Sequence, residues 1–239
     1  MSIAGTAKLW AAALICAAAL LATPASAQDV QAQWEAHMRE GGRAYGLAQM
    51  EIAARELDAA LVLAEKNFSA DDVKMISTWL NIVPLRRAQS RLDEAVVYGE
   101  KLLAAVTKVN GADSPELMAP LTMMATTYRD LGDFAASDKA YLRTIALHEK
   151  FFGDSHPRTV TMLEDRAVML GRAGRLEEGV KLFEEVVELW KYGLGMGHLR
   201  EAISRRGYAE ALRKMGREAD ATAQETLANQ IAAFWEAGR

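Results

Sequence analysis

The positions of small and bulky residues along this chain repeat every 42 residues. Gly132, Gly174 and Gly216 are separated by this interval, and two further steps toward the N-terminus reach Ser90 and Ala48. A period of about 20 to 50 residues is typical of proteins that stack copies of one small structural unit. We therefore take these five positions as the anchors of five repeats.

Each anchor has compact residues at the same distances on both sides. Seven positions before the anchors lie Gly41, Val83, Ala125, Ala167 and Ala209. Five positions after them lie Ala53, Ala95, Ser137, Gly179 and Ala221. Bulky apolar residues, such as Trp79, Leu121 and Phe183, occupy neighbouring positions. Two helix backbones should therefore approach closely in every repeat, and each repeat is predicted to be a helix, a short turn at the anchor and a second helix.

The composition agrees with an all-helical chain. Ala, Leu, Glu and Arg are frequent, only 5 of the 239 residues are proline, and this mixture favours helices over strands. A single pair of helices cannot bury its own apolar face, whereas stacked pairs bury it for one another. The sequence therefore predicts an all-α superhelix of about five helix–turn–helix repeats over residues 28–239.

The segments that join one repeat to the next also share a pattern. Gly111, Gly153 and Gly195 occupy one position in "VNGADSPEL", "FFGDSHPRT" and "GLGMGHLRE", and His156 and His198 occupy another. Glycine ends a helix because it tolerates positive φ, Asp or Ser caps the helix that follows, and proline fits its first turn. A histidine beside a serine and an aspartate resembles the site of a hydrolase, but we interpret both histidines as parts of a repeated loop.

The repeat is clearest in "LGDFAASDKAYLRTIALHEKFFGDSHPRTVTMLEDRAVMLGRAGRLEEGVKLFEE". This pattern resembles the tetratricopeptide repeat, and most closely the 42-residue variety found in kinesin light chains and many bacterial relatives. The resemblance implies an α-solenoid whose first helices line a concave groove, and a role in protein–protein interaction. HEAT repeats have a similar period, but the small-residue positions and the glycine turn argue against them.

Several residues depart from the pattern of that family. Arg166 and Glu40 lie where the family usually has leucine. Arg86 and Ala44 lie where it usually has tyrosine, and Glu225 lies where it has an aromatic residue. Apart from Arg166 in the fourth repeat, these departures lie in the first, second and fifth repeats, which match the family less closely than the third and fourth.

One stripe of residues on the first helices should face the groove. We predict that a partner-binding groove is lined by Arg87, Thr122, Thr126, Arg129, Arg172, Arg206, Arg213 and Lys214. Guanidinium groups pair with carboxylates, so the cations would bind an extended, acidic segment of another protein. The alternative is that they are solvated or pair with local acids such as Asp130, Glu164 and Glu210.

Charge and residue types reduce the number of functions that the sequence allows. The 28 basic residues are outnumbered by 32 acidic ones, for a formal net charge of −4, which opposes non-specific binding to nucleic acid. No Gly-x-Ser-x-Gly nucleophile motif occurs, and no second ligand pair accompanies His37 and Glu40 at metal-binding spacing. We therefore expect no catalytic residue, no metal and no cofactor.

Residues 1–27 have the character of a secretory signal peptide. Lys8 precedes an apolar run over residues 9–22, and Ala25 and Ala27 are spaced as signal peptidase requires. As a helix the run would span roughly 21 Å, less than the hydrocarbon core of a bilayer. Sec-type export with cleavage after Ala27 predicts a periplasmic or secreted bacterial protein with no integral membrane span. An uncleaved anchor and a lipoprotein modified at Cys16 are the alternatives.

Cys16 is the only cysteine, so cleavage would leave a chain without disulfides, thiol nucleophiles or thiolate ligands. These features together predict a non-catalytic scaffold or adaptor that is exported to the cell envelope and binds a protein or peptide. The second hypothesis is an accessory subunit of an envelope enzyme, or a cryptic hydrolase that uses the loop histidines.

Overall fold

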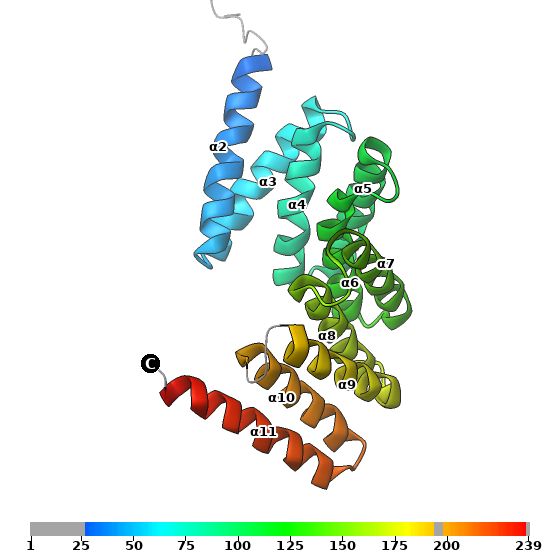
Figure 1. Ribbon diagram of the computed structural model, residues 1–239. Coiled ribbons are helices and arrows are strands. Elements are labelled where there is room, and N and C mark those ends of the chain that lie inside the picture. The colour runs from blue at the N-terminus through cyan, green and yellow to red at the C-terminus, as the bar shows by residue number, and fades with distance from the viewer. Residues whose placement is uncertain (1–26, 194–197, 238–239) are drawn as a thin grey trace, which may run out of the picture.

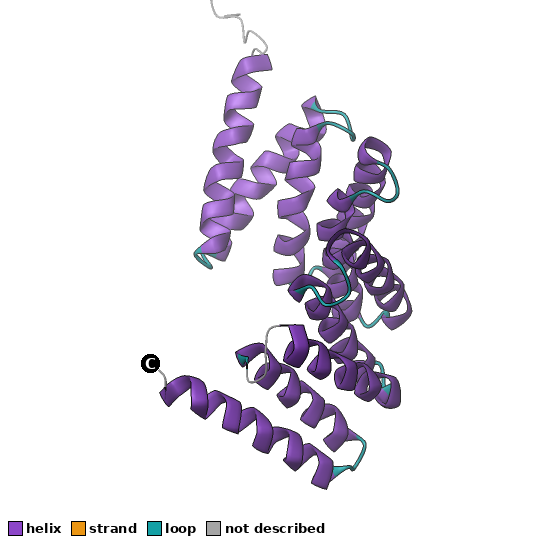
Figure 2. Cartoon of the chain, viewed as in Figure 1, coloured by secondary structure: helices purple, strands orange, loops and turns teal. Residues whose placement is uncertain are grey.

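The chain folds into a curved series of helices. The computed structural model describes residues 27–193 and 198–237, and in this part of the chain it contains ten α-helices, one 3-10 helix and no strand (Figures 1 and 2). The elements are α2 (Ala27–Gly46), α3 (Met50–Asn67), α4 (Val73–Ala88), α5 (Leu92–Asn110), η1 (Pro115–Leu117), α6 (Met118–Leu131), α7 (Phe134–Phe152), α8 (Pro157–Arg172), α9 (Leu176–Gly193), α10 (Leu199–Lys214) and α11 (Glu218–Ala237). The predicted all-α superhelix is confirmed. Residues 1–26 of the predicted signal peptide and Gly195 lie outside the described residues.

The turn inside each helical pair has a left-handed backbone at its anchor. The φ angles are 56° at Ala48, 59° at Ser90, 88° at Gly132, 77° at Gly174 and 74° at Gly216. At Ser90 the next amide, Arg91 N, donates to Arg86 O at 2.9 Å, which is the hydrogen bond of a Schellman motif. Because alanine and serine adopt this conformation at two anchors, the packing of the two helices holds the turn even without glycine.

The two small-residue positions of each repeat lie where the paired helices touch. All ten of these residues are buried. The Ser137 hydroxyl donates to the Ala125 carbonyl at 2.8 Å, across the pair α6 and α7. One repeat later, a Cβ atom added to Gly179 would lie 3.1 Å from the Ala167 carbonyl oxygen. The same close approach of the second helix to a carbonyl of the first therefore recurs in successive repeats, as the sequence predicts.

The first helices of the repeats form the inner side of the curve. The first helices are α2, α4, α6, α8 and α10, and direct contacts join α2 to α4, α4 to α6, and α8 to α10. Helices on the inside of a curved stack lie closer together than those on the outside, so α3, α5, α7 and α9 belong to the outer, convex side (Figure 1). The predicted groove residues thus lie on the helices of the concave face.

Two apolar clusters stabilise the stack. The C-terminal cluster is built around Tyr141, Phe183 and Trp190, and the N-terminal cluster includes Trp34 and Trp79. Trp34 closes the N-terminal end, where its indole Nε1 donates to Thr78 Oγ1 at 2.9 Å. Burial of each large side chain contributes roughly 1.5–3 kcal/mol. Among the described helices, none has the length and apolar character needed to cross a bilayer.

The charged residues that depart from the family pattern are held by opposite charges. Arg166 pairs with Asp138 at 2.7 Å, Glu40 with Arg43 at 2.6 Å, and Glu225 with Arg213 at 3.0 Å. Arg86 is almost fully buried and contacts two acids, Asp58 and Glu94. Ion pairs thus replace apolar contacts at these positions and leave the repeat geometry intact.

Candidate functional site

Three arginines from successive first helices converge on one carboxylate. Arg87 Nε in α4 lies 2.7 Å from Asp130 Oδ2, while Arg129 Nε in α6 and Arg172 Nη1 in α8 each lie 3.2 Å from Asp130 Oδ1. We call these four residues the arginine cluster. All three arginines lie in the last turn of their helices, where the negative end of the helix dipole favours a cation.

The arginine cluster carries an excess of positive charge. Burial raises the pKa of Asp130, but hydrogen bonding and charge from Arg87 and Arg129 outweigh it and hold the pKa below its ordinary value. At neutral pH one carboxylate therefore faces three guanidinium groups, which leaves two positive charges uncompensated within the cluster. The side chains of Arg87 and Arg172 are 37% and 46% exposed, whereas that of Arg129 is 15% exposed. The first two can reach a partner, and the less exposed Arg129 contacts the same carboxylate.

Two hollows flank the arginine cluster. One, of about 230 Å³, is lined by Tyr45, Pro84 and Arg87. Pro84 lies inside α4, where proline removes a helical hydrogen bond. The other, of about 140 Å³, lies between α8 and α10 and includes Gly171 and Arg172. Gly171 occupies the repeat position of Arg87 and Arg129, so the missing side chain leaves this space open.

The remaining predicted groove cations lie on α10 and make their ion pairs outside the arginine cluster, although Lys214 lines the same hollow as Arg172. Arg213 pairs with Glu218 at 3.1 Å and with Glu225 at 3.0 Å, while Lys214 pairs with Glu210 at 2.7 Å. Arg206 donates to the Asn229 side chain at 3.4 Å. The Lys214 pair lies within α10, and the contacts of Arg213 and Arg206 join α10 to α11.

The two predicted groove threonines use their hydroxyls within α6. Thr122 donates to the Met118 carbonyl at 2.9 Å, and Thr126 donates to the Met123 carbonyl at 2.9 Å. Of the eight predicted groove residues, the structure thus brings only Arg87, Arg129 and Arg172 together in one cluster.

Two half-buried acids, Glu164 and Asp165, lie on α8. Burial raises the pKa of Glu164, and the neighbouring Asp165 charge raises it further. Burial also raises the pKa of Asp165, against the charges of Arg129 and Arg200, which lower it. The concave helices therefore carry acidic as well as basic side chains, and burial disfavours the charged form of these two acids.

The loop histidines cap helices. His156 Nδ1 accepts a hydrogen bond from Arg158 N at 3.2 Å, and His198 Nδ1 accepts one from Arg200 N at 3.1 Å. Asp72 and Ser114 cap their helices at the same repeat position. The sequence correctly predicts a loop role, but it assigns the cap to Asp or Ser, whereas the histidine itself provides it in these two loops. Within the described ranges, no group of three or more His, Cys, Asp or Glu side chains could hold a metal ion.

Comparison with known proteins identifies the family. The model of the tetratricopeptide repeat matches residues 74–150, 118–189 and 158–228, which together cover more than half of the chain. The chain belongs to the tetratricopeptide repeat family. Proteins built from these repeats are generally non-catalytic scaffolds for protein–protein interaction.

Sequence relatives of this tetratricopeptide repeat protein are distant. The clustered mitochondria protein homolog of Aspergillus fumigatus is 21% identical over 146 residues, which cover 58% of this chain and 11% of that protein. This chain therefore spans about a tenth of the length of the curated relatives it matches.

Solved structures share its fold. The kinesin light chain TPR-like repeats from Podosopora anserina give a TM-score of 0.75 at 19% identity, covering 83% of this chain and 94% of theirs. BtubC (BKLC) from P. vanneervenii gives a TM-score of 0.64 at 14% identity, covering 87% and 92%. At these identities the likeness concerns the fold alone.

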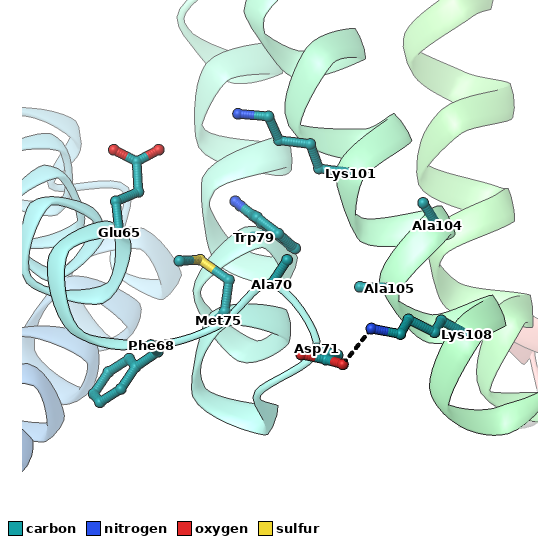
Figure 3. A pocket seen from close by; sticks show the side chains of 10 residues that line it. All are labelled: Glu65, Phe68, Ala70, Asp71, Met75, Trp79, Lys101, Ala104, Ala105 and Lys108. Atoms are coloured by element: carbon teal, nitrogen blue, oxygen red, sulfur yellow. Dashed lines mark hydrogen bonds and ion pairs between the residues drawn. The ribbon is translucent and has the colours of Figure 1, made fainter.

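One further hollow was not singled out by the sequence. It is lined mainly by Phe68, Met75, Trp79, Lys101 and Ala105 (Figure 3). The only signal in the sequence is that Ala105 stands 42 residues before Leu147, so a small side chain replaces a large one in an otherwise repeated position.

Proposed function

We propose that this protein is an exported scaffold, without a catalytic site of its own, that binds an extended acidic segment of a partner protein across its concave face. The observation that carries the proposal is the arginine cluster. It gathers cations from three repeats at the inner side of the stack, with two exposed guanidinium groups and a net positive charge. An extended segment could contact α4, α6 and α8 at once, and the flanking hollows could receive its side chains.

Charge reversal at the exposed arginines tests the groove. The double substitution Arg87→Glu, Arg172→Glu should weaken binding of a fluorescent Glu-rich peptide by at least tenfold, because each change removes one cation and adds one anion. Binding is measured by fluorescence polarisation at several salt concentrations. The matched control is Lys139→Glu, Lys181→Glu, which makes the same charge change at two exposed lysines on α7 and α9. A site at the arginine cluster would be contradicted if the two double variants weakened peptide binding equally, or if neither weakened it.

Export is tested with the full chain in a Gram-negative host. The apolar run over residues 9–22 and the small residues before Gln28 support cleavage after Ala27. We expect the protein in the periplasmic fraction, with a mass that corresponds to a chain beginning at Gln28. Ala25→Lys, Ala27→Lys should leave the uncleaved precursor. Recovery of the full-length chain from the cytoplasm would refute export.

A further inference from the structure

A hollow on the outer side of the stack lies between two outer helices. It has a volume of about 490 Å³ and is bounded by α3, by the loop from α3 to α4, and by α5. Figure 3 shows Met75 and Trp79 of α4 between these walls, with Phe68 below and Lys101 above. Because the first helix α4 forms the floor, the hollow opens on the side away from the concave face. We call it the outer pocket.

The outer pocket has a small residue where the next repeat has a large one. Met75, Trp79 and Ala105 correspond by the 42-residue repeat to Leu117, Leu121 and Leu147. In that next repeat the three leucines are buried in one apolar cluster, so Leu147 fills the space between the outer helices. Ala105 is too short to do so, and the space remains open.

One of the two lysines of the outer pocket keeps the pairing of its counterpart in the next repeat. Lys108 pairs with Asp71 at 2.6 Å, and the corresponding Lys150 pairs with Asp113 at 3.4 Å. This pair is therefore common to both repeats and stabilises the loop.

Lys101 is the exception among these charges. The corresponding Arg143 donates to the Ala112 carbonyl at 3.1 Å and ties down the loop. Lys101 makes no such contact within the described chain, where its ammonium lies 5.2 Å from the ring of Tyr98 and no carboxylate is within ion-pairing distance. The outer pocket thus combines an open apolar space with an ammonium group that is free to bind an anion.

We propose that the outer pocket binds a small amphipathic carboxylate, with its apolar body against Phe68, Met75 and Trp79 and its carboxylate on Lys101. The volume lies within the range of small-molecule sites. The loop closes the pocket at one end, so it suits a small molecule better than an extended polypeptide segment. Figure 3 also places Glu65 across the pocket from Lys101. This site goes beyond the proposed function and does not depend on it.

Isothermal titration of the protein with decanoate and with decan-1-ol tests the proposal. Ala105→Leu should weaken binding of both probes at least tenfold, because the new side chain occupies the space that Leu147 fills one repeat later. Ala104→Leu is a second filling variant at an exposed position of the pocket wall, and it avoids strain in the core.

Two charge variants separate the carboxylate contact from apolar burial. Lys101→Met should weaken decanoate about threefold, as expected for an exposed ion pair, and leave decan-1-ol unchanged. Glu65→Gln should strengthen decanoate by a similar factor, because it removes a nearby negative charge. Lys139→Met, at an exposed lysine of α7, is the matched control and should change neither.

Three outcomes would overturn the proposal: no binding of decanoate to the wild type, unchanged binding to both folded filling variants, or equal effects of Lys101→Met on both probes. The indole N–H of Trp79 has no hydrogen-bond partner among the described residues, so its NMR signal gives an independent readout of occupancy. The filling variants should still bind the Glu-rich peptide, and the Arg87→Glu, Arg172→Glu variant should still bind decanoate. Failure at one site is therefore distinguishable from failure at the other.

Discussion

Removing the two acids beside Arg86 should destabilise the fold more than replacing Arg86 itself. The Arg86 side chain is only 5% exposed, whereas its partners Asp58 and Glu94 are 42% and 43% exposed. A buried charge that loses its partners cannot recover hydration, while exposed acids that lose theirs can. We expect Asp58→Asn, Glu94→Gln to lower the free energy of unfolding by about 2–3 kcal/mol, below the full cost of breaking a buried pair, because Gln89 still accepts from Arg86 at 3.1 Å.

Arg86→Met should be close to neutral, within about 1 kcal/mol. Leu170 and Leu212 occupy the same repeat position and are fully buried, so the site accepts an apolar side chain. Urea unfolding followed by far-ultraviolet circular dichroism measures both variants. The control Glu149→Gln, Glu185→Gln removes two exposed acids that do not contact Arg86 and should leave the free energy of unfolding unchanged or slightly raised. A greater loss in Arg86→Met than in the double variant would show that the arginine acts mainly through its packing.

The helical repeat was predictable because it depends on local and periodic constraints. A helix pair needs a left-handed turn and small residues at its close approach, and both recur at fixed positions in the sequence. Ser90 adopts a positive φ, which favours glycine, and its place in the 42-residue period still identified it as a turn residue. The caps were also readable in part, because Asp72, Ser114, His156 and His198 are each 42 residues apart. Which residue supplies the capping atom in the two histidine loops required coordinates.

The site was predictable only in outline. The pattern assigned the cluster arginines to the concave helices and named Asp130 among their alternative partners, but it could not show that three arginines meet there. Arg213 and Lys214 belong to the same stripe, but they pair with acidic side chains of α11 and α10 instead. The outer pocket differs from the next repeat in the volume of one side chain, Ala105 in place of Leu147. Such a difference acquires meaning only when the facing residues are known.

An added side chain at two glycines of the fourth repeat should change the free energy of unfolding in opposite directions. A Cβ at Gly179 would lie 3.1 Å from the Ala167 carbonyl oxygen and 3.5 Å from Leu170 Cβ, whereas a Cβ at Gly171 would meet nothing within 4 Å. The carbonyl belongs to the backbone of α8 and can move only if the helix moves. We expect Gly179→Val to lower the free energy of unfolding by about 2–3 kcal/mol through overpacking, and hence Tm by roughly 4–10 °C.

Gly171→Ala should instead raise the free energy of unfolding by about 0.5–1 kcal/mol, because alanine favours a helix over glycine and no neighbour opposes it. Scanning calorimetry of the two variants compares the signs directly. Arg172 projects from the same helix that Gly179 packs against, so displacement of α8 by Gly179→Val should also weaken binding of the Glu-rich peptide, while Gly171→Ala leaves the arginine cluster in place. A stable Gly179→Val variant with unchanged peptide binding would mean that the close approach of α8 and α9 is not required to position the arginine cluster.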